Sequence, residues 1–210
     1  MEIITRITLR GSRALIVSDA GEKGWIRKST LAETGWQEGD PLNEEAWEAV
    51  MRGAECRAAV DEGARYLASP RSRAEVEHKL LSRGYREDVV REACDRLEEY
   101  GYIRDEDYAR MSVEAYASRG EGKRRVQQRL LHKGISREVA QAAVEELDEE
   151  QERRNAVREA EKLMRGYASL DAQTAKRRLT AALLRRGFSW DTVSQALAET
   201  IHKDAEDPWE

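Results

Sequence analysis

The residues best suited to chemistry in this sequence are lysines and arginines that occur in two matching clusters. The first cluster contains Lys123, Arg124, Arg125, Arg129 and Lys133. The second contains Lys176, Arg177, Arg178, Arg185 and Arg186. Ammonium and guanidinium groups bind carboxylates and phosphates, so the clusters predict contact with an acidic protein surface or a nucleic-acid backbone. We take these ten residues as the candidate partner-binding site.

The net charge of -5 hides this basic character, because acidic residues gather directly after the first cluster. These are Glu138, Glu145, Glu146, Asp148, Glu149, Glu150 and Glu152, with no lysine or arginine between them. A second interpretation of the clusters follows, in which the basic residues only solvate their helices and pair with the acidic helix nearby. Charge alone favours this second interpretation. The basic triplets Lys123-Arg124-Arg125 and Lys176-Arg177-Arg178 occupy equivalent repeat positions, and this duplication strengthens the partner-binding interpretation.

Catalytic chemistry has little support in the sequence. The three histidines, His78, His132 and His202, belong to no HExxH motif, and the chain has neither a phosphate-binding loop nor a nucleophile elbow. Asp105 and Asp107 have ligand-type side chains, but capping of a helix explains Asp105 without a metal. We therefore predict no enzymatic activity, no cofactor and no metal site.

The elements that position the clusters come from a repeated block. LLSRGY at 80–85, LLHKGI at 130–135 and LLRRGF at 183–188 share one pattern. An apolar residue stands one helical turn before each block, at Val76, Val126 and Leu179. A period of roughly 50 residues is typical of helical repeats that bury their apolar faces against one another.

Each block is predicted to form a helix, a tight turn and a second helix. Gly84, Gly134 and Gly187 end the first helix, since a left-handed residue is cheapest without a Cβ. Ser136 and Ser189 are suitable caps for the next helix in copies two and three, whereas copy one has an arginine there.

The rest of the chain supplies the remaining elements. Alternating apolar residues over 3–9, followed by 14–18 and 25–27, predict a small antiparallel sheet of about three strands. Asn43 is a candidate cap for a helix to Leu67, and Ser72 with Glu75 forms a capping box before the first block. A helix capped by Asp105 follows the first block. The second block is predicted to lead into one long helix that runs through Leu147 to Met164 and is broken only near Gly166.

We therefore expect a mainly α fold of elongated tandem three-helix repeats, similar to helix-turn-helix units, with a small N-terminal antiparallel sheet. The predicted divisions are 1–42 for the sheet, 43–118 for a linking helix and the first three-helix repeat, 119–168 for the second repeat, 169–203 for the third, and 204–210 for an acidic tail. No apolar run approaches the roughly 20 residues of a membrane-spanning helix, and the N-terminus lacks a signal-peptide pattern. We expect a cytoplasmic monomer.

The order of these segments resembles the RecX family of recombination regulators. The segments are RSRAEVEHKLLSRGY, GYIRDEDYA and GKRRVQQRLLHKGIS, after a small N-terminal sheet. The resemblance covers nearly the whole chain. Its most specific pattern, between Ser72 and Ala143, is Leu-x-x-[Arg/Lys]-Gly followed by Asp-x-x-[Tyr/Phe]-Ala, which here is Asp105, Tyr108 and Ala109.

The resemblance implies a non-enzymatic regulator of the RecA recombinase. Such a regulator lies along the groove of the RecA filament on single-stranded DNA and most often inhibits assembly, ATPase and strand exchange. It thereby regulates DNA repair, recombination and the SOS response. This chain departs from the family pattern at Glu75, which stands where Arg125 and Arg178 stand in the other repeats, and in its overall acidity. We also expect this protein to bind DNA directly, but weakly. The alternatives are a DNA-binding helical repeat protein that acts without RecA and a scaffold for an unrelated partner.

Overall fold

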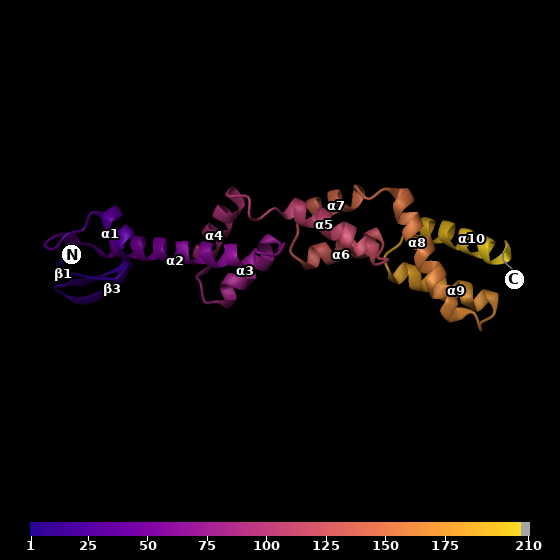
Figure 1. Cartoon of the computed structure of the whole chain (residues 1–210), viewed down its shortest axis with the longest axis horizontal. Helices are drawn as coiled ribbons and strands as arrows, with labels where there is room; N and C mark the ends of the chain where they lie inside the picture. The colour runs from indigo at the N-terminus through magenta and orange to yellow at the C-terminus, as the bar shows by residue number, and fades with distance from the viewer. Residues whose placement is uncertain (207–210) are drawn as a thin grey trace. The chain divides into compact units, whose positions relative to one another are not determined.

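The computed structural model of the chain describes residues 1–206, which include ten α-helices and a four-stranded sheet (Figure 1). They form two compact units. The first unit comprises Met1–Ala68 and Glu77–Tyr102, and the second comprises Ser69–Val76 and the described chain from Ile103 onward. The predicted mainly α fold with a small N-terminal antiparallel sheet is confirmed. Residues 207–210 of the predicted acidic tail lie outside the described residues.

The sheet of the first unit has the order β3-β2-β1-β4, and all its pairings are antiparallel. Its strands are β1 (Glu2–Arg10), β2 (Arg13–Ser18), β3 (Gly21–Arg27) and β4 (Pro41–Leu42). The first three strands confirm the sequence prediction. Two elements were not predicted: β4 has only two residues, and helix α1 (Lys28–Thr34) begins without a capping side chain. Short elements of this kind depend on tertiary packing more than on local signals.

The helices of the first unit begin with a long helix that leaves the sheet. These helices are α2 (Glu44–Tyr66), α3 (Arg73–Ser82) and α4 (Glu87–Glu99). Asn43 caps α2 as predicted, since its Oδ1 accepts from the N–H of Ala46 at 2.6 Å. Trp47 of α2 joins the sheet core, and further along α2 packs against α4. Only the first turn of α3 belongs to the second unit.

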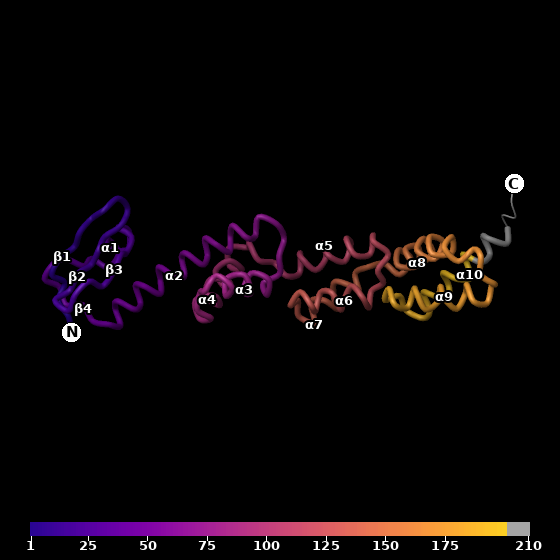
Figure 2. Tube along the Cα trace, turned by 90° about the horizontal axis from the view of Figure 1, so that it is seen from below, coloured from indigo at the N-terminus to yellow at the C-terminus, as the bar shows by residue number. Residues whose placement is uncertain are grey.

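The second unit contains two clusters of three helices. The first cluster is α5 (Asp105–Ser118), α6 (Lys123–His132) and α7 (Arg137–Glu145), and the second is α8 (Glu149–Met164), α9 (Ala172–Arg185) and α10 (Trp190–Glu206). Figure 2 follows both clusters along the trace. Each has its own buried core, around Val126 and Leu130 in one and around Leu179, Leu183 and Phe188 in the other. Helix α5, which we grouped with the first repeat, therefore packs with α6 and α7.

The long helix predicted through Leu147 is wrong. Helix α7 ends at Glu145, and α8 begins at Glu149 after a break of three residues. The break lacks the glycine or proline that usually marks a helix end, but Asp148 caps α8 because its Oδ2 accepts from the N–H of Gln151 at 3.3 Å. An aspartate within an acidic run was therefore a capping signal.

The turns within the repeats confirm the predicted chemistry. Gly84, Gly134 and Gly187 have φ angles of 88°, 77° and 90°. Ser136 and Ser189 cap α7 and α10 by accepting from the N–H groups of Val139 and Thr192. The capping box of α3 is reciprocal, with Ser72 and Glu75 each accepting the other's N–H at 3.2 Å. The cap predicted at Asp105 is wrong by one position, because Arg104 is the N-cap residue of α5.

Candidate partner interface

The second unit holds two junctions in which the glycine turn of one repeat contacts the start of a helix, α3 or α6, from another repeat. At the first junction, the turn at Gly134 receives the first turn of α3. The hydroxyl of Ser72 donates to the carbonyl of Lys133 at 2.5 Å, and Oδ1 of Asp105 accepts from the N–H of Arg73 at 2.9 Å. A Cβ added to Gly134 would overlap the Cβ of Ala74, so the two backbones approach as closely as glycine permits.

The second junction has the same design. The turn at Gly187 receives the start of α6, where the N–H of Gly122 donates to the carbonyl of Arg186 at 2.8 Å. Oε1 of Glu152 accepts from the N–H of Lys123 at 3.0 Å. A Cβ on Gly122 would overlap the backbone of Gly187.

The two junctions use equivalent repeat positions, with a hydroxyl donor in one and a backbone N–H donor in the other, and sequence reasoning missed both. Ser72 and Gly122 take the same place, and so do the carboxylates of Asp105 and Glu152, each from the first turn of the next long helix. In both junctions a helix N-terminus meets the carbonyl end of another helix, an arrangement that pairs partial charges of opposite sign. The sequence signal that could have predicted the junctions is an acidic residue in the first turn of α5 and of α8, namely Asp105 and Glu152.

The junctions and their surroundings use four of the ten predicted basic residues internally. Arg125 and Arg129 both pair with Oε2 of Glu121, at 3.3 and 2.6 Å from their Nε atoms. Arg125 also reaches across the second junction, where its Nη1 donates to the carbonyl of Arg185 at 3.2 Å. The guanidinium of Arg129 lies 5.1 Å from the ring centroid of Tyr116, and its hydrogen bond to Glu121 raises the pKa of Arg129.

Lys133 and Arg186, which directly precede the turn glycines, are the other two predicted basic residues with internal partners. Nζ of Lys133 lies 2.6 Å from Oε1 of Glu75, and this hydrogen bond raises the pKa of Lys133. Burial opposes ionisation of Glu75, but hydrogen bonds from Lys133 and from the Ser72 backbone outweigh it and lower the pKa of Glu75. Nη2 of Arg186 lies 2.7 Å from Oε1 of the buried Glu159. These four residues therefore have carboxylate partners inside the protein, and those partners lie outside the acidic run at 138–152.

The other six predicted residues keep their side chains available. They are Lys123, Arg124, Lys176, Arg177, Arg178 and Arg185. Lys123 is half-buried and the other five are exposed, and within the part of the chain that the structure describes their side chains form no ion pair. They belong to the start of α6 and to α9, which meet at the second junction. The structure therefore leaves a cationic surface along these two helices.

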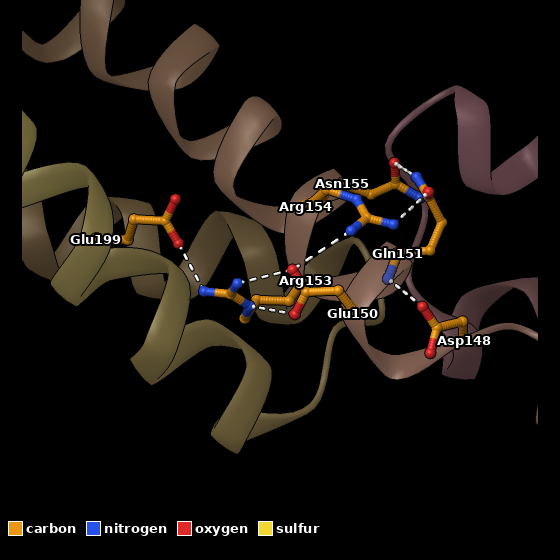
Figure 3. Close-up of polar contacts among 7 residues, drawn as sticks. All are labelled: Asp148, Glu150, Gln151, Arg153, Arg154, Asn155 and Glu199. Atoms are coloured by element: carbon orange, nitrogen blue, oxygen red, sulfur yellow. Dashed lines mark hydrogen bonds and ion pairs between the residues drawn. The ribbon is translucent and has the colours of Figure 1, made fainter.

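Asp148 and Glu150 of the acidic run contact residues of their own helix, α8, and not the six cations (Figure 3). Oε1 of Glu150 lies 2.8 Å from Nη2 of Arg153 and 3.4 Å from Nη1 of Arg154. Arg153 also pairs with Glu199 at 2.8 Å and thereby joins α8 to α10, while Asp148 caps α8. Glu150 of the acidic run is thus paired within α8, while the six cations on α6 and α9 form no ion pair among the residues that the structure describes.

The histidines considered for catalysis belong to different helices. His78 and His132 are both exposed, on α3 and α6, and the side chain of His202 is not among those described. Among residues 1–206, no group of three or more His, Cys, Asp and Glu side chains is placed to hold a metal ion. No helix in the same range combines the length and the apolar composition needed to cross a membrane.

Comparison with known proteins gives three matches to one set of family models. The first, second and third three-helix domains of RecX match residues 62–97, 105–144 and 149–197. The regulatory protein RecX of Mycolicibacterium smegmatis is 39% identical over 138 residues, which are 61% of this chain and 73% of that protein. The regulatory protein RecX of Streptomyces coelicolor is 28% identical over 189 residues, 90% of this chain and 94% of that one. A crystal structure of regulatory protein RecX shares the fold, with a TM-score of 0.77 and 22% identity over 94% of this chain and all of that chain.

Proposed function

This chain belongs to the RecX family of regulatory proteins, and from that premise we propose that it binds the RecA filament on single-stranded DNA and inhibits its assembly, ATPase and strand exchange. The observation that carries the proposal is the set of unpaired cations on α6 and α9, of which Arg124 and Arg177 occupy equivalent repeat positions. Regulation of this kind needs no catalytic step and no cofactor. We propose that the protein acts in the cytoplasm and as a monomer.

A repeated surface suits a polymeric partner. Equivalent cations on two successive repeats offer two similar contacts, and a filament repeats the surface of its protomer along its length. Once one contact forms, the second is intramolecular, so two weak contacts reach a useful affinity together. The net charge of -5 favours an acidic patch on a protein over free nucleic acid, because the rest of this chain repels a polyanion.

The test is RecA ATPase on single-stranded DNA, measured as the protein is titrated at substoichiometric ratios. Wild-type protein is expected to inhibit at few molecules per filament. Reversal of both repeat-equivalent charges, Arg124→Glu with Arg177→Glu, should abolish that inhibition. The matched control is Arg6→Glu with Arg10→Glu, which changes net charge equally at exposed positions of β1. Inhibition by the α6/α9 variant at wild-type concentrations would contradict the proposal.

Direct DNA binding is the second candidate, and the run Lys176, Arg177 and Arg178 supports it with three exposed cations in succession on α9. Its signature is salt dependence without RecA. If all six available cations contacted phosphates of single-stranded DNA, the slope of log K against log salt would be about -4. A steep slope with no effect on RecA ATPase would favour this second candidate.

A further inference from the structure

Three leucines at one repeat position remain exposed. Each repeat has a Leu-Leu pair near the end of the helix that precedes its glycine turn, and the first leucine, such as Leu130 or Leu183, is fully buried. The second leucine is exposed by 43% at Leu81, 39% at Leu131 and 37% at Leu184. A single exposed leucine is ordinary on a protein surface. The same partial exposure in three copies points to a feature of the repeat.

In the second and third repeats, an unpaired arginine shares the face of this leucine. Arg124 precedes Leu131 by seven residues, and Arg177 precedes Leu184 by seven. Seven residues are two turns of a helix, so each pair lies on one face about 10 Å apart. The first repeat has Ala74 in place of the arginine, and the Cβ of Ala74 packs at the first junction.

The second junction places the start of α6 at the turn that follows α9. The N–H of Arg124 donates to the carbonyl of Gly187 at 3.2 Å, and Gly187 follows Leu184 by three residues. The pair on α6 therefore starts where the pair on α9 ends. Along the two helices the order is Arg177, Leu184, Arg124 and Leu131, which alternates cationic and apolar side chains.

This alternation of cationic and apolar side chains indicates which kind of partner surface would fit. A phosphate backbone would pair with the arginines, but leucine gains nothing against phosphates. Single-stranded nucleic acid is usually held by aromatic side chains that stack on bases, and neither α6 nor α9 contains Phe, Tyr or Trp. A protein surface with carboxylates set between apolar side chains satisfies both kinds of residue, since apolar burial adds affinity to the charge contacts.

We infer that Leu131 and Leu184, together with Arg124 and Arg177, form one docking surface for a protein partner that presents alternating acidic and apolar side chains. This inference rests on the proposed function, in which that partner is RecA within the filament, and adds the apolar half of the contact. The arginines supply charge complementarity, and the leucines supply burial.

The test uses Leu131→Ser with Leu184→Ser in the full chain. The matched control is Met111→Ser, because Met111 is 55% exposed on α5 of the same unit and belongs to neither pair. The leucine variant is expected to raise the concentration for half-inhibition of RecA ATPase about tenfold or more, with the control unchanged. Circular dichroism and binding to single-stranded DNA alone should match wild type for both variants.

Each other outcome has a distinct meaning. If the leucine variant inhibits like wild type while the Arg124/Arg177 reversal does not inhibit, the docking surface is refuted and the proposed function stands. Equal weakening by the leucine variant and by Met111→Ser refutes a specific role for the leucines. If the leucine variant loses binding to DNA alone, the surface recognises nucleic acid and the inference is wrong. Wild-type protein without effect on RecA refutes the proposed function and, with it, the assignment of this surface to RecA.

Discussion

Replacing the three turn glycines by alanine tests the junctions directly. Gly84, Gly134 and Gly187 share the same motif and a left-handed backbone, so alanine is strained at all three. They differ in what a new Cβ would meet. Nothing lies within 4 Å at Gly84, whereas the Cβ would overlap Ala74 at Gly134 and the backbone of Arg125 at Gly187.

The expected losses in the free energy of unfolding follow from these two contributions. The left-handed conformation alone costs about 1–2 kcal/mol for alanine, so this is the loss for Gly84→Ala. Overpacking adds about 1–3 kcal/mol, which brings Gly134→Ala and Gly187→Ala to about 2–5 kcal/mol. For a chain of this size, each kcal/mol lowers Tm by about 2–4 °C.

Thermal and urea unfolding of the three variants measure the difference, and a second substitution isolates its cause. The only side chain in the way at Gly134 is Ala74, so Ala74→Gly should rescue Gly134→Ala and show a favourable coupling in a double-mutant cycle. Arg125→Gly should fail to rescue Gly187→Ala, because the backbone nitrogen of Arg125 remains in place. Equal losses at all three glycines, or no coupling between Ala74 and Gly134, would refute the junctions as described.

Two further predictions concern polar contacts. Burial opposes ionisation of Glu75, but the hydrogen bonds from Lys133 and the Ser72 backbone lower its pKa, so its contribution is present above the ordinary value of 4.5 and is lost as pH falls below it. Glu75→Gln should therefore cost about 1 kcal/mol at pH 7, and urea unfolding curves of variant and wild type should converge in acid. Asp148→Ala should cost about 1 kcal/mol by removing the cap of α8, whereas Glu149→Ala, one residue later, should change Tm much less.

Sequence periodicity predicted most of the fold because the local signals were redundant. In each repeat, a buried leucine, a glycine in the left-handed region and, in two copies, a capping serine all agreed. The break at Asp148 was missed because we looked for glycine or proline, while a single capping carboxylate was sufficient to start α8. Strand β4 was missed for a different reason. Its two residues pair with β1, and such a pairing has no local period.

The candidate site was harder to predict because equivalent positions in the repeats have different surroundings. Glu75, Arg125 and Arg178 occupy one repeat position. Glu75 pairs with Lys133 at the first junction, Arg125 reaches the carbonyl of Arg185 at the second, and Arg178 is exposed on α9. A basic residue in the sequence therefore indicated either a junction contact or a free cation, and only the packing of one repeat on the next separates the two.

The exposed leucines were missed although their positions in the sequence were known. Their position was visible as the second letter of each Leu-Leu pair, but a leucine in a helical repeat is expected to belong to the core. Burial of the first leucine and exposure of the second follow from the 100° that separates neighbours on a helix. Since the exposed leucine shares its face with an unpaired arginine in two repeats, charge alone describes only half of this surface. On the docking surface that we propose, substitutions limited to arginine remove only the charge contribution, and leucine variants measure the apolar one.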